Sequence, residues 1–167
     1  MQASAGKRKV VGKYNLVAEV GHGGMADVFL AVSYGAAGAS KLAVIKEPRP
    51  EMASDPDLMA MFLDEARLAS RLNHPNIVQT YEVGQDGDRY FIAMEYLEGQ
   101  PLSRIRTKLR GSGGLPRHMQ LRVIADILAA LHYAHELRDY DGRPLGVVHR
   151  DVTPQNVFVT YSGHTKL

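Results

Sequence analysis

The residue pattern changes at positions 98–101, and this change constrains the fold more than any other feature of the sequence. Five stretches before it have the alternation or β-branched content of strands, and one has the apolar spacing of a helix. We predict strands at 14–20, 27–33, 41–46, 77–84 and 89–96, and the helix at 54–72. Beyond it the chain becomes mainly helical, with helices predicted at 102–109 and from 116 to about 137. The sequence therefore predicts an α+β fold, with a five-stranded antiparallel lobe carrying one helix at 14–97 and the start of a mainly helical lobe at 98–167.

The composition excludes several classes of protein. The 167 residues include no cysteine, so a disulfide framework, a thiolate zinc site and a thiol nucleophile are ruled out. A net charge of +2 is too small to indicate nucleic-acid binding, and we assign the basic residues 7–9 to a flexible basic tail at 1–13. No apolar stretch is long and uninterrupted enough to predict a membrane segment.

A cluster of glycines at 21, 23 and 24 lies between two predicted strands. Because no helix pattern follows, the dinucleotide-binding fingerprint of strand, glycines and helix does not apply. A Walker A loop would end in Gly-Lys-Ser/Thr, which is absent here. Two interpretations remain: a flexible hairpin whose backbone N–H groups close over phosphates, or an ordinary glycine-rich turn.

A lysine and a glutamate on neighbouring predicted elements form a candidate ion pair. Lys46 ends the third strand on the same face as Leu42 and Val44. The helix, for which Ser54 is the predicted N-cap, has an inward stripe that we place at Leu58, Phe62, Glu65, Ala69 and Leu72. A carboxylate on an apolar stripe is costly unless it is paired. We therefore predict a Lys46–Glu65 ion pair.

An acid and an amide lie five residues apart in the stretch 147–159, at Asp151 and Asn156. The stretch is apolar at both ends and turns at Pro154, so we predict a strand, a tight loop and a strand. A phosphoryl-transfer site uses such a pair, because the carboxylate accepts a hydroxyl proton and the amide oxygen binds Mg²⁺. A surface turn with no function is also consistent with these residues alone.

The long helix predicted from 116 has apolar residues at the spacing of a core stripe. These residues are Ile124, Ile127, Leu128 and Leu131, followed by His135. We expect His132 and His135 to pack or to lie on the surface, and not to bind a ligand.

Taken in order, these motifs resemble those of the eukaryotic-type Ser/Thr protein kinases, most closely their bacterial branch. The likeness rests on Gly21-His22-Gly23-Gly24-Met25-Ala26-Asp27-Val28, Ala43-Val44-Ile45-Lys46, Glu65, Met94-Glu95-Tyr96-Leu97 and the stretch from His149 to Asn156. It extends over roughly residues 14–167 and implies a protein-kinase-like fold.

The resemblance implies an ATP site. In it, the nucleotide is covered by the hairpin residues Val20, Gly21, Gly23, Gly24, Met25, Ala26 and Val28. Lys46 contacts the α- and β-phosphates, and Glu65 holds Lys46 in place. The adenine slot is lined by Val44, Met94 and Phe158, and the purine edge is bound by backbone groups of Glu95 and Leu97.

The resemblance also implies a catalytic role for Asp151, Lys46 and Asn156. Asp151 would orient the substrate hydroxyl and accept its proton, and Asn156 would hold Mg²⁺. Arg150 resembles the arginine that in many kinases contacts a phosphate on the activation loop. The implied partner is a protein substrate with a Ser or Thr hydroxyl, and the implied location is the cytoplasm. Whether the protein forms a dimer is left open.

The sequence departs from the family pattern in three ways. Ala26 replaces the third glycine of the hairpin, and Thr153 replaces the lysine that in Ser/Thr kinases follows the catalytic aspartate by two residues. In the family, Asp-Phe-Gly follows soon after the strand that Lys166 begins, and this sequence ends before it. We therefore expect the chain alone not to transfer phosphate at a useful rate, and we expect an exposed apolar surface at the long helix. The alternative is a pseudokinase or regulatory module that binds nucleotide or a partner without catalysis.

Overall fold

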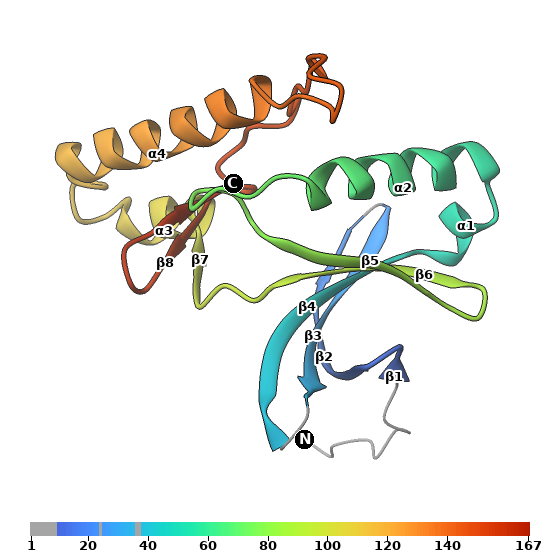
Figure 1. Cartoon of the computed structure of the whole chain (residues 1–167). Helices are drawn as coiled ribbons and strands as arrows, with labels where there is room; N and C mark the ends of the chain where they lie inside the picture. The colour runs from blue at the N-terminus through green and yellow to red at the C-terminus, as the bar shows by residue number, and fades with distance from the viewer. Residues whose placement is uncertain (1–9, 24, 36–37) are drawn as a thin grey trace, which may run out of the picture. The chain divides into compact units, whose positions relative to one another are not determined.

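The computed structural model describes residues 10–23, 25–35 and 38–167. The chain divides into two compact units (Figure 1). The first consists of Met1–Arg71 and Gln79–Tyr96, and the second of Leu72–Val78 and Leu97–Leu167.

The first unit is built on a six-stranded antiparallel sheet in the order β1-β2-β3-β4-β6-β5. Its strands are β1 Val10–Val11, β2 Tyr14–His22, β3 Ala26–Tyr34, β4 Ser40–Pro48, β5 Thr80–Asp86 and β6 Arg89–Glu95. The protein-kinase-like α+β architecture is as the sequence predicts, but β1 is an additional strand. The prediction of a flexible tail is wrong for residues 10–11, because Val11 is fully buried and pairs with Tyr14.

Each face of the sheet contributes to its own core. One core contains Val11, Tyr14, Ala31, Ala43, Ile45, Phe91 and Ala93. The other consists of Met52, Phe62, Ala66 and Ile92, with Met94 packed against it. Alternation along β4 and β6 explains the division, since successive side chains of a strand point to opposite faces.

Two helices of the first unit, α1 Pro50–Ala53 and α2 Pro56–Ser70, replace the single helix predicted at 54–72. The predicted N-cap at Ser54 is wrong. Asp55 caps α2, because its Oδ1 accepts hydrogen bonds from the backbone N–H groups of Asp57 and Leu58. The hydroxyl of Ser54 instead donates to the Pro50 oxygen in α1.

The predicted inward stripe of α2 is correct only in part. Phe62 and Ala66 are the buried residues of this helix, whereas Leu58 and Glu65 are exposed. The apolar residues Met59, Phe62 and Leu63 of α2 pack in the core cluster with Ile92 of the sheet. Glu65 lies beside this apolar stripe and not within it.

The second unit combines a small sheet with two helices. Its sheet has the order β7-β8-β9, with β7 at Gly99–Pro101, β8 at Phe158–Thr160 and β9 at Thr165–Lys166. The helices are α3 Leu102–Leu109 and α4 Arg117–His135, close to the predicted bounds. The strand predicted at 147–148 does not form, since these residues have no strand partner and Val148 is exposed.

Residues Leu72–Val78 belong to the second unit, although the sequence assigns them to the first lobe. Hydrogen bonds to the end of the chain explain this placement. The N–H of Val78 donates to the Leu167 oxygen, the N–H of Leu167 donates to the Asn76 oxygen, and Asn76 Nδ2 donates to the Thr165 oxygen. The strand predicted from 77 therefore begins only at Thr80.

The buried face of α4 consists of Val123, Asp126, Ala130 and Ala134. The predicted core stripe is therefore wrong at Ile124, Leu128 and His135, which are exposed. Two of the four buried residues are alanines, and the buried Asp126 accepts from Arg122 Nε at 2.9 Å. An exposed apolar surface on this helix is expected from the sequence and is present. No helix in the described part of the chain has the length and apolar character needed to cross a membrane.

Candidate active site

The predicted site residues fall into two groups, one in each unit. The first group begins with the glycine hairpin between β2 and β3, where Gly21 pairs with Val28 and His22 with Asp27. The N–H of Gly23 donates to the Ala26 oxygen at 3.0 Å, which closes the turn. Gly24 lies outside the described residues.

A backbone hydrogen bond ties the hairpin to the residue after β4. The N–H of Arg49, which follows β4, donates to the Met25 oxygen at 3.1 Å. The side chains of Val20 and Met25 are exposed, whereas Ala26 is buried. The small side chain of Ala26, at the place of the third glycine, is therefore accommodated inside the unit.

Val28, Lys46 and Ile92 form a continuous row across three strands, because Lys46 pairs with Val28 on one side and with Ile92 on the other. Two residues further along the same strands, Val44 pairs with Met94. Directly paired residues share a face, and so do residues two apart. The structure thus brings the predicted phosphate-binding lysine and the predicted adenine-lining residues of this unit onto one face.

The predicted ion pair between β4 and α2 is present, with Lys46 Nζ 3.7 Å from Glu65 Oε1. The predicted cause of the pairing is wrong, because the Glu65 side chain is 72% exposed and burial does not force it to pair. Lys46 is more enclosed than its partner and lies 5.9 Å from the Phe62 ring centroid. The carboxylate and the ring together limit the directions that the ammonium group can take.

The residues predicted to bind the purine occupy different elements. The N–H of Glu95 at the end of β6 donates to the Gln79 oxygen at 2.9 Å, and Glu95 Oε1 accepts from the N–H of Gln79 at 2.6 Å. Leu97 is the first residue of the longer of the two segments that form the second unit, Leu97–Leu167. Phe158 begins β8, where it pairs with Pro101 and Lys166.

The second group centres on the loop that contains Asp151 and Asn156. The Asn156 amide nitrogen Nδ2 donates to Asp151 Oδ2 at 2.7 Å and to the Asp151 backbone oxygen at 3.0 Å. The N–H of Asn156 donates to the Thr153 oxygen at 3.0 Å, which closes the turn at Pro154. The structure therefore brings the predicted acid and amide into direct contact, and both side chains are exposed.

Arg150 has a left-handed backbone conformation, with φ of 64°. It is the one non-glycine residue with positive φ in the described parts of the chain. Such a conformation is disfavoured for a residue with a Cβ atom and persists where the surroundings impose it. It directly precedes Asp151, whose N–H donates to His149 Nδ1 at 3.3 Å. The backbone conformation of Arg150 therefore orients the Asp151 side chain relative to the loop.

Two backbone hydrogen bonds anchor the loop to the first turn of α3. The N–H of Leu102 donates to the Val157 oxygen at 2.7 Å, and the N–H of Ser103 donates to the Pro154 oxygen at 2.8 Å. The first N–H groups of a helix have no partner within the helix, so these bonds also satisfy the helix end. Sequence reasoning missed both residues, because backbone donors carry no side-chain signal.

The donor set of the loop fits a magnesium ion. Asn156 donates both of its side-chain hydrogen bonds to Asp151 through the amide nitrogen, so its carbonyl oxygen Oδ1 does not take part in them. Magnesium prefers oxygen ligands of this kind, together with carboxylates and phosphates. The ammonium group of Lys46 and the backbone amides of the hairpin suit phosphate oxygens.

The sequence model of the protein kinase domain matches residues 14–167, which is nearly the whole chain. The chain belongs to the protein kinase family. A tyrosine-protein kinase of Myxococcus xanthus, MasK, is 46% identical over 160 residues, covering 93% of this chain and 24% of MasK. The serine/threonine-protein kinase PrkC of Bacillus subtilis is 35% identical over 160 residues, covering 96% of this chain and 22% of PrkC.

A solved kinase structure supports the fold. The kinase domain of Mycobacterium tuberculosis PknI matches 98% of this chain with a TM-score of 0.75 and 27% identity. This kinase chain covers 62% of the PknI domain and about a quarter of the length of the curated kinases named above. The family membership and the kinase-like fold predicted from the sequence are thus confirmed.

Proposed function

We propose that this chain supplies the ATP-binding residues and the catalytic loop of a protein kinase that transfers the γ-phosphoryl group of ATP to a Ser or Thr hydroxyl. The observation that carries the proposal is the contact between Asn156 and Asp151 on a loop tied to α3. A fixed carboxylate beside an amide oxygen is the arrangement that phosphoryl transfer requires.

Asp151 acts on the substrate hydroxyl. Its Oδ2 is held by Asn156, so its other carboxylate oxygen can accept the hydrogen bond of the incoming hydroxyl. As the substrate oxygen bonds to the γ-phosphorus, the bond from that phosphorus to the β,γ-bridging oxygen breaks and ADP leaves. The hydroxyl proton passes to the Asp151 carboxylate. Most of the rate enhancement comes from positioning and charge neutralisation.

Lys46 neutralises charge on the α- and β-phosphates, and Glu65 restricts its motion. Val28, Val44 and Met94 supply an apolar wall for the adenine ring, because they lie on the same face of the sheet as Lys46. The side-chain-poor hairpin at Gly21 and Gly23 lets backbone N–H groups approach phosphate oxygens.

Asn156 Oδ1 is the magnesium ligand that this chain offers in its catalytic loop. A magnesium ion held there would offset the negative charge of the ATP phosphates. Asn156 therefore has two functions in the proposal: it orients Asp151 through Nδ2 and binds the cation through Oδ1.

The class of hydroxyl is a separate part of the proposal. PrkC is named a serine/threonine kinase and MasK a tyrosine kinase. Thr153 replaces a lysine that would help to neutralise the transferring phosphate. Phosphoamino-acid analysis of the labelled product decides between Ser/Thr and Tyr.

Nucleotide binding tests the first part of the proposal without requiring transfer. Displacement of a fluorescent ATP analogue by MgATP should give saturable binding, and Lys46→Ala should weaken it about tenfold or more, as expected for a lost charge-assisted contact. Lys41→Ala is the matched control, because Lys41 lies on the same strand with its Nζ over the Tyr81 ring. Equal affinity of the wild type and Lys46→Ala would refute the assignment of Lys46.

A further inference from the structure

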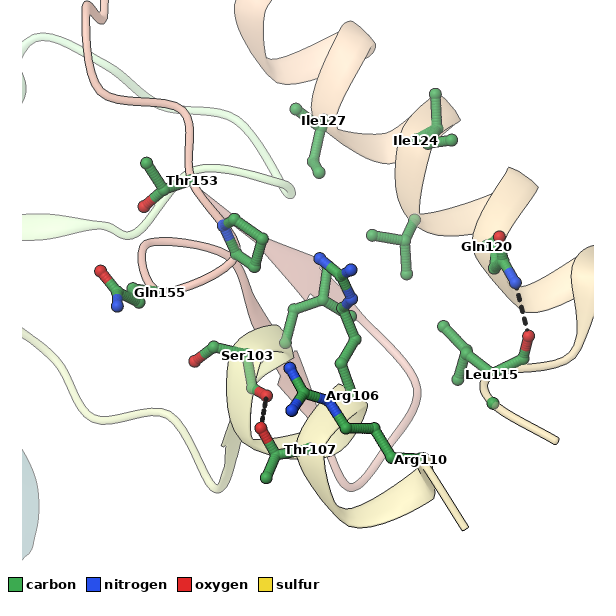
Figure 2. A pocket seen from close by; sticks show the side chains of 14 residues that line it. Ser103, Arg106, Thr107, Arg110, Leu115, Gln120, Ile124, Ile127, Thr153 and Gln155 are labelled. Atoms are coloured by element: carbon green, nitrogen blue, oxygen red, sulfur yellow. Dashed lines mark hydrogen bonds between the residues drawn. The ribbon is translucent and has the colours of Figure 1, made fainter. Parts of the chain in front are cut away.

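A cluster of metal-ligating side chains lies beside the glycine hairpin of the first unit. Among the described residues, Glu19, His22 and Asp27 bring two carboxylate oxygens and a ring nitrogen within 4.8 Å of one another. The cavity of about 770 Å³ in the second unit differs in chemistry (Figure 2). Its lining includes Arg106 and Arg110 but no aspartate, glutamate or histidine. A cation therefore suits the hairpin cluster and not that cavity.

A β-bulge in β2 explains how the three side chains meet. The pairing of β2 with β3 shifts between Glu19 and Gly21, where β2 has one residue more than β3. In a regular strand, residues three apart point to opposite faces. The extra residue offsets this alternation, and Glu19 Oε1 lies 3.5 Å from His22 Nδ1. His22 and Asp27 are directly paired across the two strands, so they share a face.

The separations within the cluster suit a transition-metal ion. His22 Nδ1 lies 2.8 Å from Asp27 Oδ1 and 3.5 Å from Glu19 Oε1. Ligand atoms at about 2.0–2.2 Å from a tetrahedral Zn²⁺ lie roughly 3.3–3.6 Å from one another. The side chains of Glu19 and His22 are more than half exposed, so they are free to make the small rotations that this geometry needs.

One oxygen atom of the cluster lacks a hydrogen bond. Asp27 Oδ1 is buried, and no group in the described part of the chain donates a hydrogen bond to it. His22 Nδ1 is close to this oxygen, but the contact does not have hydrogen-bond geometry. No lysine or arginine of the described residues pairs with Glu19 or Asp27. A buried carboxylate oxygen without a donor is costly, and a bound cation would satisfy it.

We propose that Glu19, His22 and Asp27 bind a divalent transition-metal ion of the Zn²⁺ class. An imidazole nitrogen suits Zn²⁺, whereas Mg²⁺ prefers oxygen ligands. Three protein ligands leave one position of a tetrahedral ion for water. The ion joins β2 to β3 beside Gly21 and Gly23, so it restricts the motion of the hairpin. The inference goes beyond the proposed kinase function, which uses backbone groups of the hairpin and not these three side chains.

Calorimetric titration of the nucleotide-free chain with Zn²⁺ tests the inference. Zn²⁺ should bind at one site, and an equal concentration of Mg²⁺ should not compete for it. Three variants, His22→Ala, Glu19→Gln and Asp27→Asn, should each weaken Zn²⁺ binding at least about tenfold, the loss that removal of even an outer-shell partner causes. Circular dichroism would show whether each variant is folded. Wild-type affinity in His22→Ala and Glu19→Gln would overturn the inference.

The matched control is His118→Ala, because His118 is an exposed histidine of α4 outside the cluster. It should bind Zn²⁺ with wild-type affinity. A loss in His118→Ala equal to that in His22→Ala would show binding by surface histidines in general and would refute the site.

Nuclear magnetic resonance locates the bound ion. Zn²⁺ should shift the backbone amide signals of Glu19, His22 and Asp27, and these shifts should disappear in His22→Ala. Shifts confined to α4, where His132 and His135 are both exposed, would show adventitious binding there and refute the proposal.

The outcomes for the metal site and the nucleotide site are separable. Zn²⁺ binding that depends on His22, in a chain that does not bind MgATP, would support the metal site and refute the nucleotide site. MgATP binding in a chain whose Zn²⁺ affinity is unchanged by His22→Ala would support the nucleotide site and refute the metal site.

Discussion

Asn156 donates two hydrogen bonds from one nitrogen atom to Asp151, at 2.7 Å to the carboxylate and at 3.0 Å to the backbone oxygen. The side chain that would hold magnesium is thus the one that orients Asp151, the proposed proton acceptor. A change at Asn156 should therefore affect both cation binding and catalysis.

Two substitutions at Asn156 should separate these effects in a transfer assay of a complete kinase domain that includes these residues. Asn156→Ala removes the cation ligand and the donor, so it should raise the Mg²⁺ concentration at half-maximal rate about tenfold or more. Asn156→Asp keeps an oxygen ligand but places a second carboxylate against Asp151. It should bind Mg²⁺ better than Asn156→Ala while still lowering the maximal rate. An unchanged Mg²⁺ dependence in Asn156→Ala would contradict the metal assignment.

Glu65→Gln should reduce nucleotide affinity or turnover while leaving stability nearly unchanged. The Glu65 side chain is 72% exposed, and exposed ion pairs contribute only about 0–1 kcal/mol to the free energy of unfolding. Asp64→Asn is the control, because Asp64 pairs with Arg67 at 2.9 Å on the same helix. Denaturant unfolding and turnover would be measured for both variants. A loss of stability without a loss of function in Glu65→Gln would assign the pair a structural role.

Arg89→Ala should destabilise the first unit by roughly 1–3 kcal/mol, because it removes a cation from a buried carboxylate. The partner is Glu47, which is 6% exposed and lies on the core face of β4 with Ala43 and Ile45. Arg67→Ala breaks an exposed pair and should change the free energy of unfolding by less than about 1 kcal/mol. Equal effects of the two variants in urea unfolding would contradict this account.

The stability of the first unit should fall in alkaline solution. Burial raises the pKa of the Tyr14 hydroxyl above its ordinary value of 10.0, and the Glu82 carboxylate raises it further. A group whose pKa is higher in the folded state stabilises that state below its unfolded pKa and loses this contribution as pH rises through the folded pKa. The free energy of unfolding should therefore fall above pH 10.0, and less steeply in Tyr14→Phe. Identical slopes in the two proteins would refute the assignment to Tyr14.

The elements with strong periodicity could be predicted from the sequence. The alternation along β4 correctly places Ala43 and Ile45 on one face of the strand and Lys46 on the other. The bounds of α3 agree with the helix predicted at 102–109. The placement of Asp151 and Asn156 on one short loop with a turn at Pro154 also follows from the sequence, whereas their direct hydrogen bond is seen only in the structure. Local patterns suffice here because the side chains involved are close in the sequence.

The features that were mispredicted depend on contacts between distant residues. Val147 and Val148 have strand-like side chains, but a strand forms only with a partner, and β8 pairs with β7 and β9 instead. Ser54 and Asp55 are both good N-caps, and the separate helix α1 at Pro50–Ala53 determines which one caps α2. Predicting the burial of Val11 requires knowing that it packs in one core with Tyr14 and Phe91.

Transfer of labelled phosphate from [γ-³²P]ATP by a complete kinase domain that includes these residues tests the central claim most directly. Asp151→Asn should lower the rate at least about a hundredfold while MgATP still binds, because general-base catalysis supplies an effect of this size. Asp141→Asn, in an exposed turn of the same unit, should transfer at the wild-type rate. Transfer by Asp151→Asn at the wild-type rate would contradict the account.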